Sequence, residues 1–267
     1  MGIALNKLRS VSKLGIFNYN IYEFKGYIPA EDRELYHYEI KAPSSCVVSI
    51  NGVQPEPAYI QVVENFSDAA NYITLPSVNT YVASALTAVP EIVITKDGEP
   101  VSFEMSESID LGDGYESFET LADADCDFDV LAFAEQWSRF MTKDLSGTLY
   151  GFYNISKNFI KDSAQYNRAR SWARSIDITF TSHHTLKNPA FTEQRATNVV
   201  RYSADAVGVD VHLVKHMRLS TGRDQDDAMD SRIYLIRYQE KWYVVNMRGL
   251  SGDESANETP EGESSGV

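Results

Sequence analysis

The chain has 267 residues, of which 43% are hydrophobic and 23% are charged, a composition typical of a folded globular protein. Its 38 acidic and 24 basic side chains give a net charge of −14, which argues against binding to nucleic acid or to anionic lipid surfaces. The length exceeds that of one typical domain, so we expect two. No run of the sequence approaches the roughly 18–20 apolar residues that span a bilayer, so we expect no membrane segment.

The first part of the sequence predicts β-strands. Residues 16–28 and 35–40 alternate apolar and polar side chains, which is the period of a strand. Residues 46–50 alternate again up to Asn51-Gly52, a pair that is favoured in type I′ turns, so we expect a hairpin around this turn.

A second hairpin is expected around Asp97-Gly98, with Ile92 and Ile94 leading into the turn and residues 101–105 leading out of it. The strands between residues 30 and 108 therefore predict a small β-sandwich or β-roll, with residues 1–29 packing on it as a strand segment. The Ala-rich residues 80–88 are not assigned.

Residues 109–126 are acidic and contain glycine, so we expect a linker there. The apolar period then becomes that of a helix beginning at Val130, with Asp127 or Asp129 as its cap. Shorter helices are expected near residues 145–153 and 164–172.

After residue 175 the period returns to two. Strands are expected at residues 176–180, in a long run over 196–217, and in a final hairpin of 232–238 and 242–247. One face of the long run carries Val207, Val209, Val211 and Leu213. Helices followed by strands predict an α+β fold, with helices packed on a curved antiparallel sheet over residues 127–250. Residues 251–267 are acidic with few apolar residues, and we expect a disordered tail.

The order of elements over residues 120–250, and the closing hairpin IYLIRYQEKWYVVNM, resemble the cone-shaped domains of the nuclear transport factor 2-like superfamily. In that superfamily an aromatic residue after a lysine starts the last strand, as Trp242 follows Lys241 here. The resemblance implies a cone-like domain at residues 127–250. Cone domains often dimerise through their sheets, so the resemblance is also compatible with a homodimer.

The segment YHYEIKAPSSCVVSINGVQP is similar to small β modules of bacterial envelope proteins, in which a strand runs into an Asn-Gly turn. Taken as a whole, the chain resembles uncharacterised Gram-positive cell-envelope proteins that end in a cone domain. An extracytoplasmic location follows as an expectation of this resemblance, although such proteins usually carry a membrane helix upstream that this sequence lacks.

Alternating aspartates suggest one candidate metal site. Asp123, Asp125 and Asp127 have the spacing of the first calcium ligands of an EF-hand loop. Phe128 occupies the glycine position and Ala134 the position of the bidentate glutamate, so a solvated linker that ends in a helix cap is the favoured interpretation. Asp224, Asp226, Asp227 and Asp230 are likewise interpreted as a polar loop between two strands.

Candidate catalytic residues lie on the predicted strands, because cone-fold enzymes that move protons use a carboxylate or a histidine in an apolar pocket. Asp177, Asp210 and His212 are the candidates. Asp210 faces solvent if the valine stripe packs under the helices, and it lines the cone if the valines face outward. The histidines form no metal pair: His212 and His216 share a face of a strand, but four residues separate them by about 13 Å.

Arginines around a tryptophan form a candidate ligand-binding site. Arg170 and Arg174 are four residues apart, so on a helix they share a face that could bind an anion or stack on Trp172. Pairing with nearby carboxylates is the favoured alternative in so acidic a chain.

These observations favour a non-catalytic binding or scaffolding protein whose protein or small-molecule partner is not specified by the sequence. The alternative is an isomerase- or dehydratase-type enzyme that uses a carboxylate or histidine in the cone. No cofactor is expected, since Cys46 and Cys126 lack the spacing of a zinc site. The same spacing gives no disulfide framework, and we expect two free thiols.

Overall fold

A computed structural model describes the backbone of residues 8–14 and 19–24, and residues 35–149, 151–175 and 183–250 with their side chains. The described chain is rich in strands and holds few helices, so the predicted α+β class is confirmed. The strand predicted at 176–180 and the tail predicted at 251–267 lie outside the described residues.

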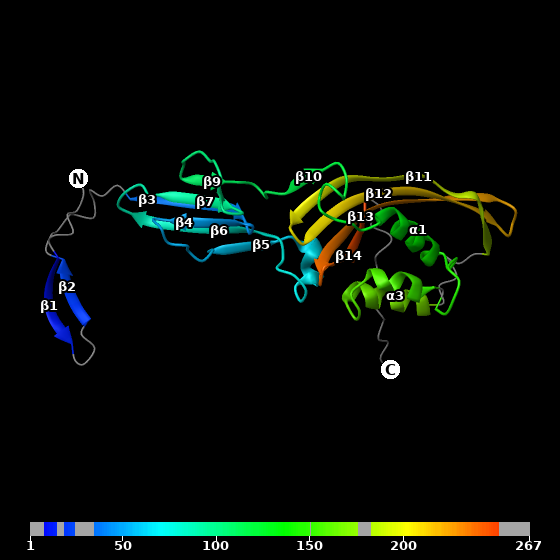
Figure 1. Ribbon diagram of the computed structural model, residues 1–267, viewed down its shortest axis with the longest axis horizontal. Helices are drawn as coiled ribbons and strands as arrows, with labels where there is room; N and C mark the ends of the chain where they lie inside the picture. Colours follow the sequence, from blue (N-terminus) through cyan, green and yellow to red (C-terminus); the bar gives the residue numbers. More distant parts are fainter. Residues whose placement is uncertain (1–7, 15–18, 25–34, 150, 176–182, 251–267) are drawn as a thin grey trace, which may run out of the picture.

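The chain begins with an antiparallel hairpin of β1 (Leu8–Leu14) and β2 (Tyr19–Phe24). Within the described part of the chain this hairpin is a sheet of its own and pairs with no third strand. Figure 1 shows it at one end of the long axis, apart from the rest of the molecule. The sequence period predicts a strand only for the part that forms β2.

Residues 36–110 form a unit of two small sheets, called here the two-sheet unit. The strands have the order β5 (Tyr59–Val62), β6 (Ser77–Leu86), β3 (Tyr36–Pro43), β9 (Ser108–Asp110) in one sheet and β4 (Cys46–Ile50), β7 (Ile92–Lys96), β8 (Glu99–Pro100) in the other. One hydrophobic cluster, with buried side chains from β3, β4, β6, β7 and β9, joins the two sheets. Most of the Ala-rich segment that the period does not assign lies in β6, an inner strand of its sheet.

The two Asx-Gly turns lead to different strand pairings. Asp97-Gly98 turns with positive φ at both residues and joins β7 to β8 as predicted, but the returning strand is only Glu99–Pro100 and the predicted residues 101–105 lie outside it. Asn51-Gly52 also turns with positive φ, but only the isolated bridge from Ile50 to Val53 closes it, so the predicted hairpin is wrong. β4 pairs instead with β7. Pro55 and Pro57 explain the difference, because proline has no N–H to donate to a ladder.

Residues 116–249 form a second unit, the five-stranded unit. Its antiparallel sheet has the order β10 (Glu116–Phe118), β11 (His184–Ser203), β12 (Ala206–Leu219), β13 (Asp224–Tyr238), β14 (Lys241–Gly249). The single run predicted over residues 196–217 is therefore two strands joined by a tight turn. The aspartates interpreted as a polar loop begin β13 instead, because their strand extends the ladder with β12.

Helices cover one face of this sheet (Figure 1). They are α1 (Val130–Met141), α2 (Phe152–Ile155), the 3₁₀ helix η4 (Ser156–Asn158) and α3 (Ala164–Arg174). Asp129 caps α1 by accepting a hydrogen bond from the backbone N–H of Ala132 at 3.0 Å. The valine stripe of β12 is buried under the helices, together with phenylalanines from α1, α2 and the loop before α3.

The opposite face of the sheet is partly covered by the two-sheet unit. A 3₁₀ helix, η3 (Glu64–Ala69), comes after β5 and packs Phe66 against Tyr234 and Ile236 of β13. Phe66 has 0% of its surface exposed, and its ring meets Tyr234 edge-on at 5.4 Å. The two units are thus joined through a shared hydrophobic cluster, end to end along the long axis (Figure 1).

The segment predicted as an acidic linker, residues 109–126, takes part in both units. Its start belongs to β9, which pairs in parallel with β3, and its middle forms β10 at the edge of the larger sheet. Ala124 and Cys126 are buried in the core under the helices, while the aspartates on either side of Ala124 are exposed. Among the described residues, no helix has the length and apolar character needed to cross a membrane.

Candidate functional site

Of the three aspartates proposed as calcium ligands, Asp123 stabilises local structure, and the three do not share one set of contacts in the described part of the chain. Asp123 accepts hydrogen bonds from the backbone N–H and the hydroxyl of Thr120, at 3.2 and 2.7 Å. Asp125 lies 3.5 Å from Arg237, and Asp127 is exposed. Within the described residues, no group of three or more histidine, cysteine or acidic side chains has the geometry to hold a metal ion.

Asp210 lies on the face of the sheet away from the helices. The valine stripe packs under the helices, so the even-numbered residues of β12 face the other way. Asp210 is nevertheless only 9% exposed. Its Oδ1 lies 2.7 Å from Nε of Arg232, and its Oδ2 accepts a hydrogen bond from Asn198 at 2.8 Å. The alternative in which Asp210 lines the space under the helices is therefore excluded.

His212 is on the same outer face, beside Asp210. Its Nδ1 lies 2.5 Å from Asp230 and its Nε2 lies 3.2 Å from Glu193. His216, farther along β12, pairs in the same way with Asp226 at 2.6 Å. These cross-strand pairs hold β11, β12 and β13 together at a partly exposed surface. The third catalytic candidate, Asp177, lies outside the described residues.

The arginines proposed as a ligand site lie on α3. Arg174 is exposed, and Trp172 between the two arginines is packed against the core. Neither Arg170 nor Arg174 has a carboxylate of a described residue within 4.0 Å. Their neighbour Arg168 does form an ion pair, with Asp68 of η3 at 3.1 Å, and so ties the helices to the two-sheet unit.

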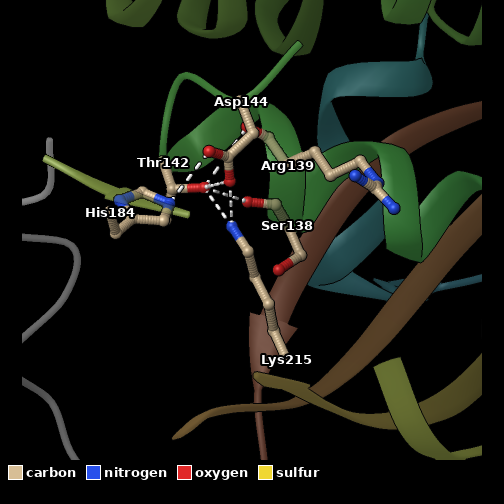
Figure 2. Close-up of polar contacts among 6 residues, drawn as sticks. All are labelled: Ser138, Arg139, Thr142, Asp144, His184 and Lys215. Carbon is tan, nitrogen blue, oxygen red and sulfur yellow. Dashed lines mark hydrogen bonds and ion pairs between the residues drawn. The ribbon is translucent and has the colours of Figure 1, made fainter. Parts of the chain in front are cut away.

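The most buried polar cluster of the described residues surrounds Lys215, which the sequence patterns did not single out. Lys215 has 0% of its surface exposed and points from β12 toward the end of α1. Its Nζ donates hydrogen bonds to Oδ2 of Asp144 and to the hydroxyl of Thr142. On the other side, Nε2 of His184 lies 2.9 Å from Oδ1 of Asp144. Figure 2 shows the three groups converging on the carboxylate.

Local structure explains how these groups meet. α1 ends at Met141, and the hydroxyl of Thr142 lies 3.1 Å from the carbonyl of Ser138 in the last turn. Lys143 has a positive φ of 61°, which turns the chain so that Asp144 faces the sheet. The Thr142 hydroxyl also lies 2.6 Å from Asp144.

The electrostatics of the cluster favour an ion pair. Burial lowers the pKa of Lys215, and the nearby Asp144 carboxylate opposes that shift without cancelling it. Burial would raise the pKa of Asp144, but hydrogen bonds from Lys215 and Thr142 outweigh it and lower the pKa. A carboxylate with a depressed pKa, an amine and an imidazole together can accept or donate protons. They can do so for a substrate only if one reaches them.

Neither of the following two surface depressions, both formed by described residues, reaches this cluster. One of about 440 Å³ lies where η3 meets α3 and β14, and its lining is Glu64, Asn65, Ser67, Asp68, Arg168, Asn246 and Arg248. The other, of about 420 Å³, lies on the helical side and its lining is Gln136, Leu145, Tyr153, Asn154 and Lys157. None of the candidate catalytic residues lines either depression.

One signal in the sequence could have revealed Lys215. It continues the odd-numbered stripe of β12 that contains Val211 and Leu213, and the same parity places it under the helices. A lysine in a buried stripe needs an acidic partner. That partner, Asp144, lies 71 residues away in a loop, and no periodicity marks it.

Comparison with protein-family models and with curated proteins finds no match to this chain.

Proposed function

We propose that this chain is a non-catalytic binding or scaffolding protein of a bacterial cell envelope. In this proposal the two-sheet unit is a small β-sandwich, and the five-stranded unit is a cone-like domain of the nuclear transport factor 2-like kind. The order of elements, an amphipathic helix followed by short helices and long antiparallel strands, supports the resemblance. So does the closing hairpin of β13 and β14.

One observation carries the non-catalytic part of the proposal. The space between helices and sheet, which in a cone-shaped enzyme would hold the substrate, is filled by buried aromatic side chains. They are Phe133, Phe140, Phe152, Phe159 and Trp242, none more than 4% exposed. A small-molecule site needs a concave space of several hundred Å³. The burial of these rings in one hydrophobic cluster argues against such a space under the helices.

A second observation supports a scaffolding role. Phe66 and Ala69 of η3 are fully buried against the sheet, so the two units are held in a fixed relation by hydrophobic contact. The polar faces of such a two-part body remain available to partners.

Thermal denaturation in the presence of small ligands tests the proposal. The wild-type chain is expected to show no saturable rise in Tm with benzene, indole or a panel of small ketones, because the interior is filled. Phe140→Ala is the matched control: it opens an apolar cavity of the kind that binds benzene, so its Tm should rise with that ligand. A saturable rise in the wild type, lost on replacing Asp144 by Asn, would contradict the proposal.

A specific observation keeps the enzyme alternative as a second candidate. Asp144, His184 and Lys215 form a buried cluster of a carboxylate, an imidazole and an amine on the helical side of the sheet. An isomerase or dehydratase of the cone type would use such a carboxylate or histidine as its base. Saturable ketone binding by the wild type in the same experiment would favour this second function.

A further inference from the structure

Strand β5 forms an exposed and uncharged edge of the two-sheet unit. It is the outermost strand of its sheet, and Tyr59, Ile60 and Val62 are 62%, 52% and 40% exposed. Natural edge strands usually carry a charge, a proline or a bulge that blocks pairing with another chain. The four residues of β5, Tyr-Ile-Gln-Val, include neither a charged residue nor a proline.

The backbone of β5 has hydrogen-bonding groups directed outward. Val63 donates its N–H to the carbonyl of Pro76 at 3.0 Å. The backbone N–H and C=O groups of the odd-numbered residues of β5 therefore point toward β6. Because an antiparallel strand alternates in this respect, the N–H and C=O groups of Ile60 and Val62 point away from the sheet. These groups are a template for one additional strand.

The β1–β2 hairpin is a pair of strands that a third strand would stabilise. A two-stranded hairpin is marginally stable alone in water, and it gains stability from a third strand. No described strand outside the hairpin pairs with it, and Figure 1 shows it away from β5 of its own chain.

The charges of the two elements are complementary. Residues 1–25 contain four basic side chains (Lys7, Arg9, Lys13, Lys25) and one acidic side chain, Glu23, in a chain whose net charge is −14. β5 is flanked by acidic residues, Glu56 before it and Glu64 after it. A basic strand therefore meets less electrostatic repulsion at this edge than an acidic one would.

We propose that the β1–β2 hairpin of one copy of this chain adds to the β5 edge of a second copy and extends its sheet. This inference concerns self-assembly and does not depend on the proposed function. The two contact surfaces are different, so each copy offers one hairpin and one edge. Such a contact closes into a dimer if two copies exchange hairpins, and otherwise continues to larger assemblies.

Sedimentation equilibrium of the full chain is the first test. The weight-average mass should rise with concentration above the 30.0 kDa of one chain. Ile60→Lys places a charge on the edge, and Arg9→Glu with Lys13→Glu reverses the charge of the hairpin; each variant should remain at the mass of one chain. Val62→Lys serves as a second edge variant, and circular dichroism checks that each variant is folded. Val93→Lys is the control, because Val93 is also exposed but lies on β7, the central strand of the other sheet.

Mixing the defective variants gives a sharper test. An Ile60→Lys chain retains its hairpin, and the Arg9→Glu/Lys13→Glu chain retains its edge. Together they should form a one-to-one complex in native mass spectrometry, although neither assembles alone. If the substitutions weakened association in a non-specific way, mixing the two variants would not restore it.

Three results would overturn the inference. The wild type could remain at the mass of one chain at every soluble concentration, which includes the case of a hairpin docked on its own β5. The two edge variants could assemble as well as the wild type. The mixture could also fail to form the one-to-one complex.

Discussion

At the scale of single residues, the buried Lys215 is the feature that most needs a physical account. An ammonium group taken out of water costs free energy that its partners must offset. Here Asp144 and Thr142 accept two of its three N–H groups, and Asp144 carries the balancing charge. The pair fastens the end of α1 to the middle of the sheet, so its role in this architecture is to fix the position of the helix.

Replacing Lys215 by Met tests this role. The variant leaves the Asp144 carboxylate, which is only 15% exposed, without its cation, and we expect a loss of about 3–5 kcal/mol in the free energy of unfolding, measured by urea denaturation. Lys187→Met is the control, because Lys187 pairs with Asp224 at 2.9 Å on the surface and its loss should cost roughly 0–1 kcal/mol. Equal losses of unfolding free energy in the two variants would show that the buried Lys215 pair stabilises the fold no more than a surface pair.

Cys126 supplies a prediction about alkaline pH. Burial raises the pKa of its thiol from an ordinary value of 9.0 to about 11. Between these values the unfolded chain loses the proton and the folded chain keeps it, so stability falls as pH rises, by up to roughly 1.4 kcal/mol per pH unit. Cys126→Ala should lack this decline when unfolding is measured from pH 8.5 to 11. The tyrosines are common to both proteins, so the difference isolates the thiol; identical pH profiles would contradict the prediction.

At the scale of elements, local signals predicted local structure well. The apolar period predicted α1, with Asp129 as one of two possible caps, and the Asp97-Gly98 pair predicted the turn after β7, although the strand that follows is only Glu99–Pro100. Pairing between distant strands carries no such signal. β4 pairs with β7 across more than 40 residues, although its own turn pointed to the next segment. The partners of Lys215 and Asp210 carry no local signal either, because tertiary contacts bring them together.

The contribution of the Asp129 cap to the stability of α1 can be measured by comparing it with the nearby Asp127. Asp129→Ala removes the acceptor for the N–H of Ala132 and should cost about 1 kcal/mol of stability. Asp127→Ala removes a similar charge two residues earlier, from an exposed side chain, and should be close to neutral. Urea denaturation with and without calcium measures both effects. Stabilisation by calcium that Asp127→Ala abolishes would support the metal site that we do not favour.

At the scale of the whole molecule, the cluster around Phe66 decides whether the chain behaves as one body or two. The five-stranded sheet buries one face under its own helices and part of the other under η3. Arg168 adds an ion pair to Asp68 across the same junction, and Asn246 donates a hydrogen bond to the carbonyl of Asn65 at 3.2 Å. These contacts join segments that lie 100 and 181 residues apart in the chain. Because of these contacts, unfolding of one unit removes interactions that stabilise the other unit.

Phe66→Ala should uncouple the two units. Truncating a fully buried phenylalanine costs about 3–5 kcal/mol, and here most of that loss falls on the junction rather than on either core. We expect calorimetry to show one cooperative transition in the wild type and two in the variant, because each unit keeps its own hydrophobic cluster. Tyr59→Ala is the control, since this exposed side chain of the same segment leaves the junction intact. A single transition at a lower Tm in the variant would mean that the units remain coupled through the polar contacts and the shared chain alone.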